Sequence, residues 1–155
     1  MKLVKEETTY KYDTRILLEA MIDLSESNIN RFSGSPMGEL NSIFSSITSY
    51  DTGRQTGKST TLVNYLNDTS NKNIFIIARD QIHVKDLQYV AQSKIGLDNI
   101  MSVAPGPRGS NLSIFRGLGK FTLIFDECST NEIRDFIERI EIPHYIKAVV
   151  KVGSH

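Results

Sequence analysis

Short apolar runs alternate with segments of helical periodicity over most of the chain. Residues 73–78, 121–125 and 148–152 are dense in Ile, Val, Leu and Phe, which is typical of strands buried on both faces. Residues 99–104 form a further predicted strand. Apolar residues at three- and four-residue spacing predict helices between the strands, over 58–66, 84–91 and 133–140. Buried strands that alternate with amphipathic helices predict an α/β fold with a mostly parallel sheet.

The first 36 residues are expected to form an N-terminal arm and helix that pack on a core of residues 37–155. Residues 1–13 are charged and rich in Thr and Tyr, which fits an edge strand or a loose arm. Helical spacing predicts a helix from Asp13 or Thr14 to Leu24, and the Ser, Asn and Gly of residues 25–36 predict a loop. A helix that gives way to a short strand near Ser46 is expected next.

Composition narrows the class of protein. The 155 residues suit a single domain. Lys and Arg number 18 and Asp and Glu number 18, so the formal net charge is zero. The charge of the whole protein therefore does not attract nucleic acid, although a local basic patch stays possible. One cysteine, Cys128, excludes a disulfide framework and a cysteine-rich zinc site. No apolar run approaches the ~20 residues of a bilayer-spanning helix, so we expect a cytoplasmic protein without a membrane segment.

The segment between the predicted strand near Tyr50 and the helix at 58–66 carries the most specific chemistry. Gly57-Lys58-Ser59 matches the end of a phosphate-binding loop, or Walker A motif. In such a loop, glycine lets backbone N–H groups approach a phosphate, the lysine reaches the β- and γ-phosphates, and the serine hydroxyl binds Mg²⁺. The predicted nucleotide-binding residues are Gly53, Arg54, Gln55, Thr56, Gly57, Lys58, Ser59 and Thr60.

The loop departs from the strict pattern at its start. The first glycine of G-x-x-x-x-G-K-S would fall at position 52, where the chain has Thr52, and Gly53 comes one place later. A glycine-bearing turn before a surface helix is therefore the alternative interpretation of this segment.

An acidic pair supports the nucleotide-binding interpretation. The apolar run 121–125 leads directly into Asp126-Glu127. A buried strand that ends in Asp-Glu is typical of a Walker B element, in which Asp126 would hold Mg²⁺ and Glu127 would activate the attacking water. A cap for the next helix is the simpler interpretation of the pair alone. Together with Gly-Lys-Ser upstream, the pair predicts a site for ATP and Mg²⁺.

Four segments in order resemble the ATPase core of bacteriophage large terminases. Residues 54–59, Arg-Gln-Thr-Gly-Lys-Ser, resemble their variant Walker A motif, and Arg116-Gly117 resembles an Arg-Gly found before their Walker B motif. Residues 125–128, Phe-Asp-Glu-Cys, look like the end of that motif. Residues 149–154 resemble the coupling motif shared with superfamily 2 helicases. The resemblance spans about residues 43–154.

The resemblance implies a RecA-like P-loop fold, a three-layer sandwich with a mostly parallel sheet, and an ATPase that drives DNA translocation. Lys58 and Ser59 would contact phosphate and Mg²⁺, and Arg54 would contact the γ-phosphate region. Asp126 would bind the metal, and Glu127 would be the catalytic carboxylate. Ser154 would report the nucleotide state to DNA. A viral protein of this kind would work in the cytoplasm of the host cell.

The resemblance leaves the biological role open. Terminases continue past the coupling motif through further ATPase strands, a lid and a nuclease domain, so a stand-alone ATPase, a truncated relative and a fragment are all compatible with the sequence. We expect an ATPase coupled to nucleic acid, with double-stranded DNA favoured, and a homo-oligomer or partner protein that completes the site. The alternatives are a nucleotide-sensing interaction module and, less favoured because no Arg-rich lid is found, a small-molecule kinase.

Several other residues have both a functional and a structural interpretation. Arg79 and Arg108 follow predicted strands and are candidates for nucleic-acid contacts, as is Arg116, which could instead pair with an acid of the same chain. Cys128 is expected to be a small packing residue. Tyr10, Tyr12 or Tyr50 could stack on adenine, although packing is the simpler role. The three histidines, His83, His144 and His155, lack metal-ligand spacing and are predicted to lie on the surface.

Overall fold

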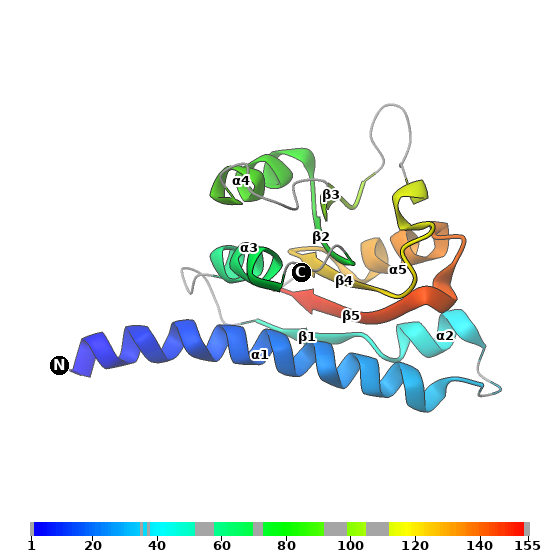
Figure 1. Cartoon of the computed structure of the whole chain (residues 1–155), viewed down its shortest axis with the longest axis horizontal. Helices are drawn as coiled ribbons and strands as arrows, with labels where there is room; N and C mark the ends of the chain where they lie inside the picture. The colour runs from blue at the N-terminus through cyan, green and yellow to red at the C-terminus, as the bar shows by residue number, and fades with distance from the viewer. Residues whose placement is uncertain are drawn as a thin grey trace.

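Five parallel strands form one sheet at the centre of the molecule (Figure 1). The computed structural model describes residues 2–34, 36, 38–51, 58–69, 73–91, 99–104 and 112–153. The strands lie in the order β1-β5-β4-β2-β3, and every neighbouring pair is parallel. Their bounds are β1 Thr48–Tyr50, β2 Ile74–Ala78, β3 Ile100–Ser102, β4 Phe121–Asp126 and β5 Ile146–Val152.

Helices cover both faces of this sheet, and each face has its own apolar cluster. On one face, α1 (Lys2–Phe32), α3 (Lys58–Thr69) and α4 (Gln81–Ala91) pack against alternate strand residues. On the other face lie α2 (Glu39–Phe44), α5 (Thr130–Arg139) and the short 3-10 helix η2 (Leu112–Phe115). A second 3-10 helix, η3 (Pro143–Tyr145), precedes β5.

The predicted α/β class with a parallel sheet is confirmed, and the reason is visible in the central strands. Every residue of β2 and of β4 is buried, so these strands need apolar side chains on both faces rather than an alternating pattern. The helices and strands predicted from residue 37 onward that lie among the described residues are all present, with ends that differ by a few residues.

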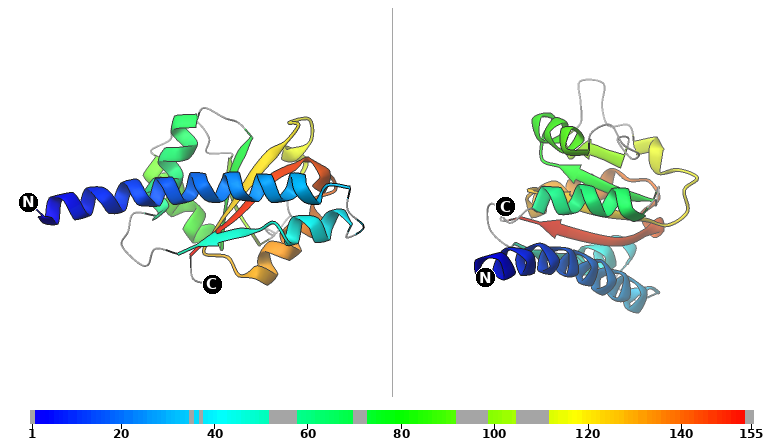
Figure 2. Two further views of the ribbon diagram at one scale, coloured as in Figure 1. Left: turned by 90° about the horizontal axis from the view of Figure 1, so that it is seen from below. Right: turned by 60° about the vertical axis from the view of Figure 1, so that its left-hand side comes forward.

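The helix predicted from Asp13 or Thr14 to Leu24 is present within α1, but the predictions for the residues before and after it were wrong. Neither an edge strand or loose arm over 1–13 nor a loop over 25–36 is present, because one helix, α1, runs from Lys2 to Phe32. This helix lies across β1 and β5, and its first turns extend beyond the sheet (Figures 1 and 2). Leu18 and Ile22 enter the core cluster of that face. Packing of this buried stripe explains why helix persists through a segment rich in Ser and Asn.

Two side-chain hydrogen bonds fix α1 to the sheet. Ser25 is fully buried, and its Oγ accepts a hydrogen bond of 2.8 Å from the backbone N–H of Val149 in β5. The Thr48 hydroxyl of β1 donates to the Met21 carbonyl at 2.8 Å. Ser25, one of the polar residues that suggested a loop, therefore satisfies a buried backbone N–H of the sheet. No helix in the described part of the chain has the length and apolarity needed to cross a membrane.

We predict that Ser25→Ala lowers the free energy of unfolding by about 1–3 kcal/mol, because it leaves the buried N–H of Val149 without an acceptor. Thermal or urea unfolding followed by circular dichroism measures the change. Ser27→Ala is the matched control, since Ser27 is exposed on the same helix. Equal stability of the two variants would contradict the role assigned to Ser25.

Candidate functional site

The strand register places the end of the strand before the predicted loop and the predicted acidic pair at one edge of the sheet. Tyr50 of β1 is in register with Val152 of β5, Val152 with Asp126 of β4, and Asp126 with Ala78 of β2. The four strands therefore end at the same level. Since neighbouring strands lie about 4.8 Å apart, the backbones of Tyr50 and Asp126 are separated by about 10 Å. We call this carboxyl edge the candidate site.

The phosphate-binding segment connects β1 to α3 at this edge. Gly53, Arg54, Gln55, Thr56 and Gly57 lie outside the described residues. Lys58 is the first residue of α3, Ser59 is half-buried in its first turn and Thr60 is exposed. This 12-residue helix begins seven residues after Asp51, which follows β1. The first N–H groups of a helix and its dipole favour an anion at the N-terminus.

Asp126 is a buried carboxylate at the end of β4. Its residue exposure is 1%, and it lies on the same sheet face as Ile124, which packs in the cluster under α1, α3 and α4. Its Oδ2 lies 2.7 Å from Nε2 of His83. A buried carboxylate is costly unless it is hydrogen-bonded, so this contact makes the position tolerable for the fold.

His83 was predicted to lie on the surface, and that prediction was wrong. Its side chain is 18% exposed and comes from the first turn of α4, directly beyond β2. Asp80 fixes this turn, because its Oδ1 accepts from the His83 N–H at 2.8 Å. The hydrogen bond to Asp126 raises the pKa of His83 above its usual value, although burial opposes the rise. Knowing that β2 pairs with β4 would have predicted that His83 lies beside Asp126. Local sequence does not give strand order.

Glu127 has a backbone conformation that is uncommon for a residue with a side chain. Its φ is 59°, in the left-handed region, and its N–H donates to the Val152 carbonyl at 2.9 Å. Gly153, with φ 105°, directly follows Val152 at the end of β5. A Cβ at position 153 would lie 2.5–2.7 Å from the carboxyl atoms of Glu127. The Glu127 carboxylate therefore lies on the bare backbone of Gly153. Strained conformations of this kind cluster at functional sites.

Two further residues at this edge have packing roles. Tyr50 is 9% exposed in the core, and no partner for its hydroxyl occurs among the described residues. Burial, and then the charge of Asp126, raises the pKa of that hydroxyl. Cys128 is confirmed as a buried packing residue. Burial raises the pKa of its thiol, which therefore stays protonated and is a poor nucleophile at neutral pH.

The predicted nucleic-acid residues are divided between the two edges of the sheet. Arg79 follows β2 at the carboxyl edge, where it is exposed with its Nε 3.6 Å from Asp80 Oδ2. Arg116 lies before β4, at the opposite edge, and pairs with Glu141. The structure therefore does not bring Arg116 to Asp126. Arg108 and Ser154 lie outside the described residues, as do His155 and the side chains of Tyr10 and Tyr12.

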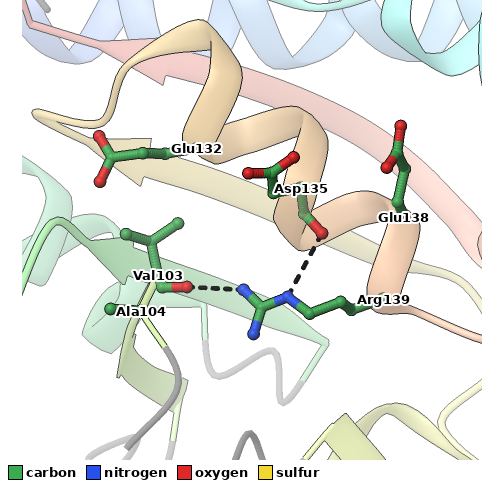
Figure 3. A pocket seen from close by; sticks show the side chains of 6 residues that line it. All are labelled: Val103, Ala104, Glu132, Asp135, Glu138 and Arg139. Atoms are coloured by element: carbon green, nitrogen blue, oxygen red, sulfur yellow. Dashed lines mark hydrogen bonds between the residues drawn. The ribbon is translucent and has the colours of Figure 1, made fainter.

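An open pocket of about 500 Å³ lies between α5 and the end of β3 (Figure 3). Arg139 crosses it, and its guanidinium donates hydrogen bonds to the Val103 carbonyl at 2.7 Å and to the Asp135 carbonyl at 3.3 Å. This arginine ties α5 to the segment after β3. Among the described residues that line the pocket, the other charged side chains are acidic: Glu132, Asp135 and Glu138.

The donor set at the carboxyl edge is small. No group of three or more His, Cys, Asp or Glu side chains suited to a metal ion occurs among the described residues. A metal bound at this edge would need oxygen ligands from a bound molecule or from water as well as from Asp126.

Comparisons with protein-family models, with curated proteins and with solved structures find no match to this chain.

We predict that Gly153→Ala destabilises the protein more than Gly119→Ala does. Both glycines have positive φ, 105° and 76°, so both variants bear backbone strain of about 1–3 kcal/mol. Only at position 153 would the new methyl group also displace the Glu127 carboxylate. Urea unfolding of each variant gives the difference.

A double-mutant cycle isolates that contact. In a Glu127→Ala background, the cost of Gly153→Ala should fall to that of Gly119→Ala, because the crowding atoms are gone. Costs that add independently would contradict the close approach of Glu127 and Gly153.

Proposed function

We propose that this chain is a Mg²⁺-dependent P-loop ATPase with a RecA-like three-layer core of the terminase and helicase type. The observation that supports it best is the meeting of two motifs at one edge. Tyr50, which ends the strand before the Gly-Lys-Ser segment, and Asp126, which begins the acidic pair, are both in register with Val152 of β5. The motifs are 67 residues or more apart in sequence, and a glycine turn or helix cap acting alone would not require this placement.

The residues fit ATP with Mg²⁺. Magnesium prefers oxygen ligands, typically one or two from protein with the remainder from phosphates and water. Ser59 and Asp126 supply such oxygens and would hold Mg²⁺, which neutralises charge on the phosphate oxygens when bound. The small carboxylate set agrees with a site in which the nucleotide completes the ligands. Lys58 would contact the β- and γ-phosphates, and Arg54 the γ-phosphate region.

Glu127 is the candidate catalytic base. It follows Asp126 directly, and its carboxylate is held on Gly153 at the end of β5. In this role one carboxylate oxygen would orient a water molecule and accept its proton as the water oxygen attacks the γ-phosphorus, while the bond from that phosphorus to the β–γ bridging oxygen breaks and ADP leaves with its electron pair. The left-handed backbone at Glu127 turns the chain so that the two consecutive acids have separate surroundings, Asp126 against His83 and Glu127 against Gly153.

Charge limits where DNA would contact the protein. The carboxylates of Glu132, Asp135 and Glu138 along α5 repel phosphates and disfavour that flank. Arg79 is exposed at the carboxyl edge beside the site and is the better candidate. We propose double-stranded DNA as the partner that the ATPase acts on in a phage context. A homo-oligomer or partner protein would complete the site.

A nucleotide-sensing module is the second candidate. The contact between His83 and Asp126 is compatible with it, because the contact bears on metal binding and not on turnover. A sensor binds ATP without rapid turnover, so hydrolysis separates the two functions.

We predict that Lys58→Ala weakens ATP binding by at least tenfold while the fold survives, because it removes the positive charge expected at the β- and γ-phosphates. Isothermal titration with ATP and Mg²⁺ measures the affinity, and circular dichroism checks the fold. Lys120→Ala is the control, since Lys120 is exposed before β4 at the opposite edge. Unchanged affinity in Lys58→Ala would remove the loop from the site.

We predict that Glu127→Gln binds ATP with an affinity within a few-fold of wild type but hydrolyses it about 10²–10⁴-fold more slowly, as expected when a positioned base is lost. Phosphate release under single-turnover conditions measures the chemical step. Glu138→Gln, an exposed acid of α5, is the control. Wild-type protein that binds ATP but releases no phosphate, with and without double-stranded DNA, would favour the sensing module.

A further inference from the structure

We infer that His83 is a positioning residue that orients Asp126 toward Mg²⁺ and the phosphates of a bound nucleotide. The inference rests on the proposed function and deepens it, because neither the phosphate-binding loop nor the acidic pair includes this residue. It is carried by the 2.7 Å contact between His83 Nε2 and Asp126 Oδ2.

The contact with His83 gives the two carboxylate oxygens of Asp126 different roles. A carboxylate accepts hydrogen bonds, so Nε2 of His83 is the donor to Oδ2. With Oδ2 held, the rotation of the Asp126 side chain is restricted, and Oδ1 is the oxygen left for a metal. Asp126 is 1% exposed at the end of a fully buried strand, so bulk water does not compete strongly for this geometry.

His83 is itself held in place by the fold. Asp80 accepts from the backbone N–H of His83 at 2.8 Å through its side chain and from that of Val84 at 3.0 Å through its carbonyl. Val84 and Leu87 anchor the same helix in the core. The helix follows β2, whose last residue, Ala78, is the register partner of Asp126. The imidazole therefore comes from a rigid support next to the carboxylate.

This arrangement is the usual one for a metal-binding carboxylate, which is oriented by a hydrogen-bond donor outside the metal's own ligands. Loss of such a donor typically weakens metal affinity or activity by 10–100-fold. A side chain with an N–H at the position of Nε2 should preserve the effect. Glutamine has an amide group at that reach, whereas leucine fills similar space without a donor.

The test compares His83→Leu and His83→Gln with the wild type by isothermal titration with ATP, in EDTA and over a series of Mg²⁺ concentrations. For His83→Leu we expect an ATP affinity in EDTA within about threefold of wild type. The Mg²⁺ concentration that gives half of the Mg²⁺-dependent gain in ATP affinity should be about 10–100-fold higher than for the wild type. His83→Gln should need no more than about threefold more Mg²⁺ than wild type. Lys85→Ala, an exposed change on the same helix, is the control.

Each outcome decides the inference. Unchanged Mg²⁺ dependence in His83→Leu would overturn it, and so would equal losses with leucine and glutamine, which would show a packing role. If His83→Leu fails to fold, a tenfold or greater loss in a folded His83→Gln would still overturn it. Wild-type protein that binds no ATP in either condition would overturn the proposed ATPase and this inference together, which distinguishes that failure from one confined to His83.

Discussion

The common register of the strand ends is the constraint on which the candidate site depends. Tyr50, Val152, Asp126 and Ala78 lie at one level because four parallel strands are paired without an offset at that edge. Every segment that leaves the edge therefore begins within a few strand spacings of the others. The end of β1, the acidic pair, the turn before α4 and Gly153 after β5 are neighbours for this reason.

That register is maintained from both faces of the sheet. On one face, α1 satisfies a backbone N–H of β5 through Ser25 and accepts a hydrogen bond from β1 through the Met21 carbonyl. On the other, the capping box of Ser129 and Glu132 starts α5 two residues after Glu127, and Arg139 ties the end of α5 to the Val103 carbonyl. The site is thus built on short strand ends whose positions are fixed by helices on either side.

The sequence predicted the fold class and most elements, because continuous apolar runs and helical spacing are local signals that buried strands and amphipathic helices must produce. It did not predict the extent of α1, since Ser25, one of the residues that favour a loop, is used here for a tertiary contact with β5. It placed the acidic pair at the end of the strand now seen as β4. It did not predict the contact of His83 with Asp126, which depends on β2 lying next to β4. Strand order is a property of the whole sheet, and no local pattern encodes it.

The close approach of Glu127 to Gly153 also limits how such a chain can diverge. Because the carboxylate lies where a side chain at position 153 would begin, and because Gly153 has φ 105°, the two positions are not free to change independently. Related chains that replace the glycine are expected to carry a shorter residue at the position of Glu127, or to have lost the base altogether. On the proposed function, paired variation at these two positions would separate hydrolysing members of a lineage from those that only bind nucleotide.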